Sequence, residues 1–214
     1  MDAFIDLVRN IFPTSIPPFT ADKAKESLKQ FKKENKFKEQ SQGLGKEYDF
    51  FDINHVGFLR QGDIISGLNY FFIDKDGGQR VVKNVKMMLI SNTCDASRDE
   101  FLHFAPLIPI ENYLSEISDE NKKRSFETQI YNNTIFRFIY LPHRELSNYV
   151  VNLNLITSIP LKIVNKRIED GMCEVKYSLN TIGFFFLLCK LAVYFMREEK
   201  PEETERDKFN LAIL

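Results

Sequence analysis

The stretch GDIISGLNYFFIDKDGGQRVVKNVKMMLIS, residues 62–91, decides the fold class. Leu68 to Ile73 and Val81 to Ser91 are rich in β-branched and aromatic residues, a composition typical of strands. Between them, the run Asp74-Lys75-Asp76-Gly77-Gly78 supplies the residue types that tight turns favour. The sequence therefore predicts a β-hairpin here.

More strand signals follow the hairpin. Phe101 to Ile110 reads as a third strand, and its Pro106 and Pro109 place it at a sheet edge or kink it, because proline cannot donate a ladder hydrogen bond. Further strands are predicted at Thr134 to Leu141, where apolar and polar residues alternate, at Tyr149 to Leu153 and at Leu155 to Val164. Short strands joined mostly without helices favour one antiparallel sheet curled into a small barrel.

Three helical parts complete the expected organisation. Residues 1–46 form a predicted N-terminal helical arm, and residues 47–214 form the barrel domain. Within that domain, about 111–131 is a polar helical insertion that ends at the turn Asn132-Asn133, and about 178–197 is a C-terminal core helix. Thr181 to Met196 is shorter than the ~20 apolar residues of a membrane span and contains Lys190. We expect its Phe184, Leu188 and Leu191 to be buried.

Composition limits the possible functions. The formal net charge is -1, so no overall field draws the chain to nucleic acid or to a membrane. Three widely spaced cysteines do not form a secreted disulfide framework, and the N-terminus does not resemble a signal peptide, so a cytoplasmic location is expected. The chain has no glycine-rich phosphate loop, nucleotide fingerprint or paired zinc motif, so no cofactor is expected.

Two groups of basic residues are candidates for binding nucleic acid. The predicted arm carries Lys29, Lys32, Lys33 and Lys36 among other charges, which indicates a solvated helix face or a surface for phosphates. Arg137 and Arg144, with His143, flank the Tyr140-Leu141-Pro142 segment and could hold a phosphate on one face of the barrel. The partner is therefore expected to be a protein, RNA or DNA, and the oligomeric state is left open.

A second set of candidates has catalytic or metal-binding chemistry. Cys94-Asp95 follows a strand, His103 comes nine residues after Cys94, and His143 follows another strand. A cysteine with a histidine and an aspartate forms a nucleophile constellation, and the same Cys94 with both histidines forms a three-ligand metal set. The alternative is a small buried thiol at a strand end, with Asp95 capping a turn.

Three short motifs carry a resemblance to a known family. Gly62-Asp63-Ile64, Met88-Leu89-Ile90-Ser91-Asn92 and Ala105-Pro106-Leu107-Ile108 occur in that order and resemble the core of the PemK/MazF toxins. The resemblance covers about half the chain. It implies a small Src-homology-3-like barrel with a C-terminal helix, and a role in cleaving single-stranded RNA that an antitoxin restrains.

The sequence departs from that family at the residues that do the chemistry. The family's arginine falls near Val85-Lys86, and its hydroxyl residue falls near Ile108. Cleavage of RNA needs an acid, a base and a group that stabilises charge, and here Lys83 or Lys86 offers only the charge. The first hypothesis is therefore a non-catalytic module of a bacterial or phage-related toxin or defence system. Its alternatives are an endoribonuclease with a displaced active site and a Cys/His hydrolase or metal protein.

Overall fold

The structure, a computed structural model, describes residues 50–52, 57–74 and 76–196. The predicted arm with Lys29, Lys32, Lys33 and Lys36 lies outside these residues. The strands are β1 (Phe51–Asp52), β2 (Ile64–Ile73), β3 (Gln79–Leu89), β4 (Phe101–Pro109), β5 (Phe138–Ile139), β6 (Tyr149–Asn152), β7 (Thr157–Pro160) and β8 (Glu174–Leu179). The helices are α4 (Ile110–Leu114), α5 (Glu120–Tyr131), the 3-10 helix η1 (Leu153–Leu155), α6 (Leu161–Glu169) and α7 (Thr181–Met196).

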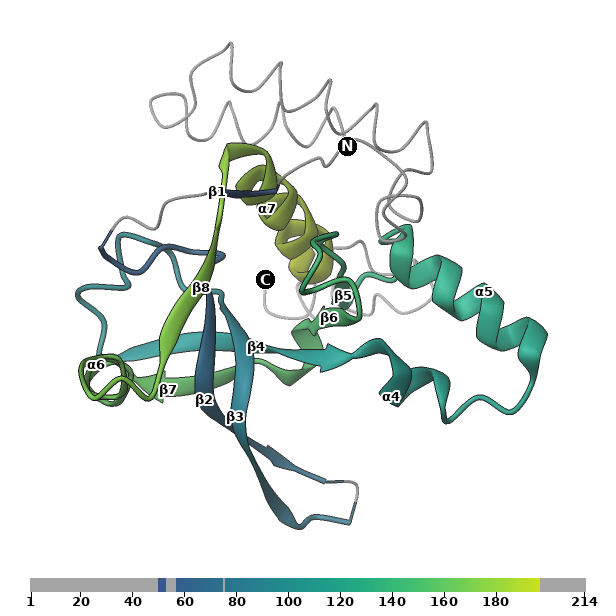
Figure 1. Ribbon diagram of the computed structural model, residues 1–214, viewed down its shortest axis with the longest axis horizontal. Helices are drawn as coiled ribbons and strands as arrows, with labels where there is room; N and C mark the ends of the chain where they lie inside the picture. The colour runs from purple at the N-terminus through teal and green to yellow at the C-terminus, as the bar shows by residue number, and fades with distance from the viewer. Residues whose placement is uncertain (1–49, 53–56, 75, 197–214) are drawn as a thin grey trace, which may run out of the picture.

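The described residues form a β-rich α+β fold around one antiparallel sheet (Figure 1). Its eight strands follow the order β1-β8-β2-β3-β4-β6-β5, and β7 also pairs with β4. Every strand pair is antiparallel, as predicted. Helix α7 packs against the sheet, whereas α4 and α5 extend away from it (Figure 1).

The predicted hairpin is confirmed as β2 and β3, and it is longer than the sequence indicated. Phe71 pairs with Val81 and Ile73 with Gln79 on either side of the turn. The Asp74 carboxylate closes that turn by accepting from the backbone N–H groups of Asp76 and Gly78, at 3.0 and 2.7 Å. An aspartate that hydrogen-bonds to its own following backbone is a common turn device, which explains why the local sequence was informative.

Strand β4 lies inside the sheet, so the edge position considered for it is wrong. One side pairs with β3 from Phe104 to Pro106. The other side pairs first with β7, up to Phe104, and then with β6 from Leu107 onward. Pro106 therefore falls where β4 changes partner, a position at which a missing ladder donor is tolerated.

Two strand predictions were too long. The predicted strand at Thr134 to Leu141 is confined to Phe138–Ile139. The strand ends there because the side chain of Asn133 occupies the backbone groups of Tyr140 that a neighbouring strand would otherwise bind. The Asn133 side-chain amide accepts from the N–H of Tyr140 at 2.7 Å and donates to the Tyr140 carbonyl at 2.9 Å. The predicted strand at Leu155 to Val164 ends at Pro160, where α6 begins.

The sequence of α6 has a helical periodicity, which the predicted strand at Leu155 to Val164 did not take into account. Leu161, Val164 and Ile168 lie three and four residues apart and therefore share one helix face. Val164 is fully buried, and the other two are half-buried against the same cluster. Strand β8, which pairs with both β1 and β2, was not predicted at all.

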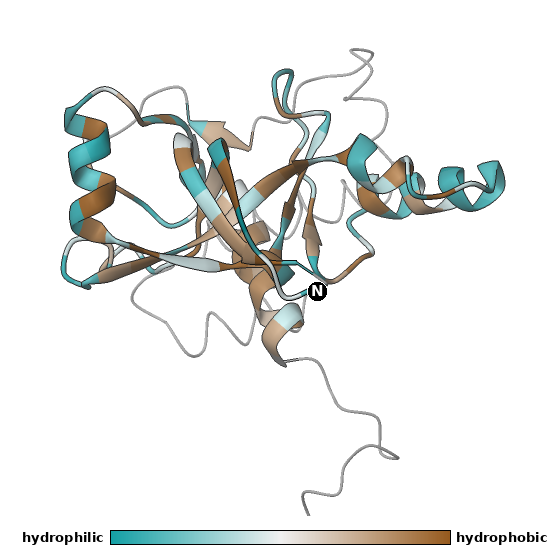
Figure 2. Ribbon diagram, turned by 90° about the horizontal axis from the view of Figure 1, so that it is seen from below, coloured by the Kyte–Doolittle hydropathy of each residue, from teal (hydrophilic) through white to brown (hydrophobic). Residues whose placement is uncertain are grey.

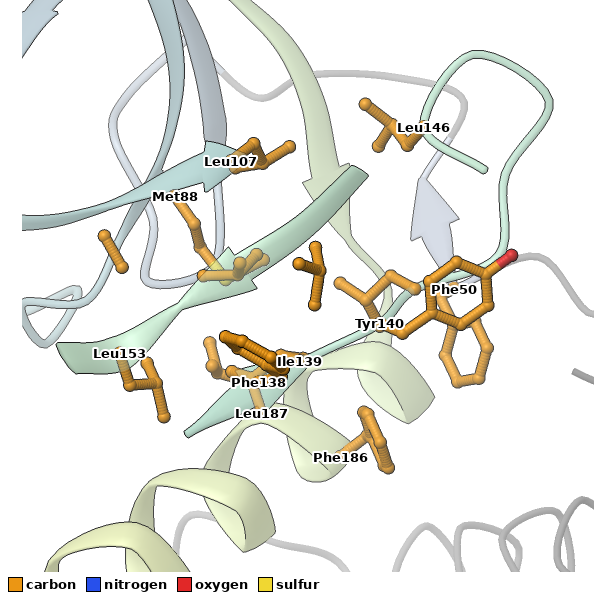
Figure 3. Packing of buried hydrophobic residues seen from close by; sticks show 14 of the residues in the cluster. Phe50, Met88, Leu107, Phe138, Ile139, Tyr140, Leu146, Leu153, Phe186 and Leu187 are labelled. Atoms are coloured by element: carbon orange, nitrogen blue, oxygen red, sulfur yellow. The ribbon is translucent and has the colours of Figure 1, made fainter. Parts of the chain in front are cut away.

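The predicted C-terminal core helix is confirmed as α7, the most uniformly apolar element in Figure 2. Leu191 is buried as expected, but Phe184 and Leu188 are only half-buried. The deepest positions of the helix are Phe185, Phe186, Leu187 and Cys189. In Figure 3 Leu187 lies next to Phe138 and Ile139, and the ring of Phe186 lies nearer to Phe50, with 6.0 Å between the two ring centroids.

Helix α7 contains one buried charge. The ammonium group of Lys190 donates to the backbone carbonyls of Asn133 and Ile135, at 3.0 and 2.9 Å. Burial lowers the pKa of Lys190 to about 8, because the protein interior solvates a charge poorly. No helix of the described residues is both long and apolar enough to cross a bilayer.

The predicted polar insertion consists of α4 and α5. The Asp119 carboxylate caps α5 by accepting from the N–H groups of Asn121 and Lys122. Its polar surface is visible in Figure 2, and Ile130 is the residue that α5 buries in the core.

Candidate functional site

The three motifs that carry the family resemblance lie side by side on β2, β3 and β4. Ile64 pairs with Met88, and Met88 pairs with Ala105. Gly62 has a φ of 92°, and its N–H donates to the Leu89 carbonyl at 2.7 Å. A side chain at Gly62 would collide with that of Leu179, so the turn before β2 requires a glycine.

Cys94 and Asp95 lie in the turns between β3 and β4. Cys94 is exposed, so the alternative of a buried thiol is wrong. The Asp95 carboxylate pairs with the Arg98 guanidinium at 3.3 Å, and Arg98 also donates to the Cys94 carbonyl. Both residues are thus part of a local turn in which arginine, rather than histidine, contacts the carboxylate.

His103 joins the strands next to that turn. The backbone N–H of His103 donates to Ser91 Oγ at 2.8 Å, and its backbone carbonyl accepts from the N–H of Ile90. The ring Nδ1 lies 2.9 Å from Ser158 Oγ on β7. These bonds hold the end of β3 against β4 and β7, which is a structural role.

His143 lies in different surroundings, between β1 and β8. Its ring packs against Phe51, with 5.3 Å between ring centroids, and against Tyr177, with 4.6 Å. Of the described residues, no group of three or more His, Cys, Asp or Glu side chains could hold a metal ion. Cys94, His103 and His143 therefore do not form the three-ligand set considered from the sequence.

The structure instead places Glu145 and Tyr177 beside His143. Lys86 and Lys176 act electrostatically on Glu145, although Lys176 also pairs with Glu174. We call these five residues, His143, Glu145, Tyr177, Lys86 and Lys176, the His143 cluster. The N–H of Glu145 donates to His143 Nδ1 at 3.3 Å, so the neutral ring carries its proton on Nε2. The hydroxyl of Tyr177 donates to the Glu145 carboxylate. A histidine, a carboxylate and a phenol from one loop and β8 are thus brought together.

The electrostatics of the His143 cluster shift the pKa values of Glu145 and Tyr177 in opposite directions. The hydrogen bond from Tyr177 lowers the pKa of Glu145, and the charges of His143, Lys86 and Lys176 lower it further. Partial burial, and then the hydrogen bond to Glu145, raise the pKa of Tyr177 to about 12. At neutral pH the cluster therefore holds an ionised carboxylate beside a protonated phenol.

Sequence reasoning found His143 but missed its partners. Glu145 stands two residues further on, whereas Tyr177 comes from β8, which had not been predicted. Lys86 had been considered only as a source of charge, and its ammonium group lies 4.7 Å from the centre of the Tyr149 ring. A tertiary contact such as that between Glu145 and Tyr177 leaves no local signal in the sequence.

The two arginines predicted to bind phosphate have different environments. Arg137 is exposed, and its guanidinium lies 4.8 Å from the centre of the Phe138 ring. Arg144 is exposed in the loop that carries His143 and Glu145. Of the two, Arg144 is the one that follows directly on a member of the His143 cluster.

The sequence matches no protein-family model and no curated protein.

The outer end of the hairpin presents a second candidate surface, which we call the hairpin face. It consists of Phe71, Ile73 and Val81, which are 57%, 71% and 51% exposed. Phe71 and Val81 are paired across the two strands, and Ile73 is two residues from Phe71, so all three side chains point to one side. In Figure 1 this end of β2 and β3 projects away from the remaining strands.

The backbone of the same region has open edges. Strand β4 pairs with β3 only from Met87 to Leu89, and β8 pairs with β2 only from Ile64 to Ser66. Beyond those points, no strand of the described residues pairs with the outer edge of either strand. Asn84, with a φ of 56°, forms an irregularity in β3, so the regular part of its open edge runs from Gln79 to Val82.

Proposed function

We propose that this chain is a non-catalytic module that binds a partner protein through the hairpin face. The observation that carries the proposal is the exposure of three large apolar side chains on one side of a projecting hairpin. Single exposed apolar residues are ordinary, but a contiguous group marks an interaction surface. The two open strand edges add unpaired backbone groups to the same surface.

These features favour an extended protein segment as the occupant. A segment that lies along Gln79 to Val82 would continue the sheet, with its apolar side chains on Phe71, Ile73 and Val81. Lys83 and Arg80 are exposed on this strand, and among the described residues Arg80 pairs with Asp74 while no acidic partner is seen for Lys83. Lys83 is two residues from Val81 and therefore lies on the same side of the strand. The expected segment thus carries apolar residues on that side and an acidic residue near Lys83.

We further propose that the sheet closes into a small barrel. We also propose that the module is an accessory component of a toxin or defence system. Support comes from the adjacency of the three resembling motifs on β2, β3 and β4. It also comes from β4, which pairs with β3 on one side and with both β7 and β6 on the other and so joins two parts of the sheet.

Site-specific photo-crosslinking tests the binding proposal. A benzoylphenylalanine in place of Ile73 should form a discrete protein adduct in cells, and Val81→Asp in the same chain should abolish it. The same probe at Phe136, which is 50% exposed outside the hairpin, provides the matched control and should give no such adduct. An adduct that survives Val81→Asp, an equal adduct from position 136, or an adduct to RNA would overturn the proposal.

The His143 cluster favours a second candidate, cleavage of single-stranded RNA without a metal ion. In this reaction Glu145 accepts the proton of a ribose 2′-hydroxyl, and the 2′-oxygen attacks the adjacent phosphorus. The bond to the 5′-oxygen breaks, and that oxygen takes a proton from the imidazolium form of His143, in which Nδ1 no longer accepts from the Glu145 N–H. The products are a 2′,3′-cyclic phosphate and a 5′-hydroxyl, while Lys86 and Lys176 stabilise the charge on phosphorus.

Incubation of the purified chain with single-stranded RNA and a chelator tests this candidate. Cleavage with cyclic phosphate ends should be lost in His143→Ala and should persist in His103→Ala, because His103 has the structural role described above. Intact RNA after incubation with the wild type, or equal loss in both variants, would rule out the His143 cluster as a nuclease site.

A further inference from the structure

A cavity of about 590 Å³ lies between α6, the loop before β2 and the turns after β3, away from both surfaces described above. We call it the α6 pocket. It is lined by Gly57, Phe58, Leu59, Thr93, Ala96, Ser97, Leu161, Asn165, Ile168, Glu169 and Val175. Its volume is within the range of roughly 300–1,000 Å³ that small-molecule sites occupy.

The floor of the α6 pocket is apolar. Ala96 is buried in the second hydrophobic cluster, and Leu59, Leu161, Ile168 and Val175 are partly buried against that cluster. Their remaining exposed surface faces the cavity that they line. Such a floor favours a hydrocarbon or aromatic body by removing it from water.

The rim of the α6 pocket is polar, and its charge is negative. Thr93, Ser97 and Asn165 supply neutral hydrogen-bonding groups, and Glu169 supplies a carboxylate. Of the described residues that line the cavity, none is a lysine or an arginine. Glu169 is also the last residue of α6, at the negative end of the helix dipole, although the carbonyl groups of Lys166, Arg167 and Ile168 already accept from the backbone N–H groups that follow the helix.

The last turn of α6 also holds two basic residues, Lys166 and Arg167, neither of which lines the cavity. The guanidinium of Arg167 is engaged elsewhere. Arg167 donates from Nη2 to the Gly67 carbonyl at 2.7 Å and from Nε to Cys173 Sγ at 3.4 Å. Asn165 and Glu169 stand four residues apart, so they share the helix face of Leu161, which lines the floor. One face of α6 therefore carries, from its start to its end, the apolar side chain of Leu161, the amide of Asn165 and the carboxylate of Glu169.

We propose that the α6 pocket binds a small apolar or aromatic molecule that carries a primary amine. The hydrocarbon part lies on Leu59, Leu161 and Ile168, and the ammonium group lies at the rim with Glu169 and Asn165. Phe58, which is 59% exposed, also lines the cavity and adds apolar contact. This site is independent of the hairpin face and of the His143 cluster.

The chain has no tryptophan, so the fluorescence of an indole probe reports binding without a background from the protein. Tryptamine carries the amine, and tryptophol is its neutral counterpart with a hydroxyl group. We expect saturable binding of both to the full chain by fluorescence anisotropy, with tryptamine about three- to fivefold tighter, the effect of one exposed ion pair. High salt should reduce that preference.

Three variants locate the site. Glu169→Gln should reduce the preference for tryptamine to within about twofold while leaving tryptophol binding unchanged. Glu111→Gln, an equally exposed glutamate on α4, should leave both affinities unchanged. Ser97→Phe should block both probes by filling the rim, and circular dichroism checks that each variant is folded. No saturable binding, equal affinity of the two probes for the wild type, or a preference that survives Glu169→Gln would overturn the proposal.

Discussion

Strands β2 and β3 pair with each other along their whole length, but their two ends have opposite environments. At the inner end Ile64, Ile65 and Leu89 are almost fully buried between neighbouring strands and helices. At the outer end Phe71, Ile73 and Val81 are mostly exposed, although they are as apolar as the inner residues. The difference shows that residue type specified the strands, whereas the neighbouring elements decided which apolar residues became core.

The largest expected effect contrasts two residues of β3. Leu89→Ala should lower the free energy of unfolding by about 2–5 kcal/mol, because it leaves a cavity in a fully buried site. Val81→Ala should change it by no more than about 0.5 kcal/mol, since the side chain is exposed. Urea denaturation of both variants measures the contrast, and similar losses would show that the hairpin face is covered in solution.

The second prediction concerns Gly67, which lies where β2 leaves the packed part of the sheet. Gly67 has a φ of 87°, and a β-carbon there would collide with the Met172 carbonyl oxygen. We expect Gly67→Ala to cost about 3 kcal/mol, from the left-handed backbone and the collision together.

Gly77 is the matched control, because it has a φ of 80° but open space around it. Gly77→Ala should therefore cost only the backbone part, about 1–2 kcal/mol. Thermal or urea unfolding of the two variants gives the difference, and equal losses would mean that the contact with Met172 does not hold the junction.

The third prediction uses the buried charge of the inner region. The pKa of Lys190 is lowered to about 8 in the folded chain, so the unfolded chain binds more protons between pH 8 and the ordinary pKa of 10.5. Below pH 8 the full free-energy cost of burying the ammonium group opposes folding. This cost disappears as the pH rises from 8 to 10.5. Relative to Lys190→Met, the wild type should gain roughly 2–3 kcal/mol of stability across this pH range.

Urea titrations of both chains at several pH values measure this gain. The methionine variant leaves the carbonyls of Asn133 and Ile135 without the ammonium donor, which shifts its stability by an amount that does not depend on pH. A difference between the two chains that stays constant from pH 8 to 10 would show that Lys190 is solvated.

The smallest effect is expected for the exposed charge pair at the hairpin turn. The hydrogen bond from Arg80 lowers the pKa of the Asp74 carboxyl, so the stabilisation is present above the ordinary pKa of 3.8 and is lost as the pH falls below it. Because the pair is in water, Asp74→Asn should change stability less than Leu89→Ala, Gly67→Ala or Gly77→Ala. Denaturation at pH 7 and pH 3 tests this, and a loss as large as that of Leu89→Ala would contradict it.

The sequence by itself determined the elements whose signals are local. The turn Asp74 to Gly78, the hairpin on either side of it and the apolar helix at Thr181 to Met196 each follow from neighbouring residues. The turn closes through its own aspartate, and the helix is too apolar to lie on a surface. Local hydrogen bonds and residue composition suffice for such elements.

Only the tertiary structure decided the length of β5, the existence of β8 and the grouping of functional side chains. Asn133 ends a strand pattern by bonding to Tyr140, seven residues away, and Tyr177 reaches Glu145 across 32 residues. The α6 pocket likewise joins residues from Gly57 to Val175. Such contacts depend on which surfaces pack together, and burial is a property of the assembled fold that no single stretch of sequence contains.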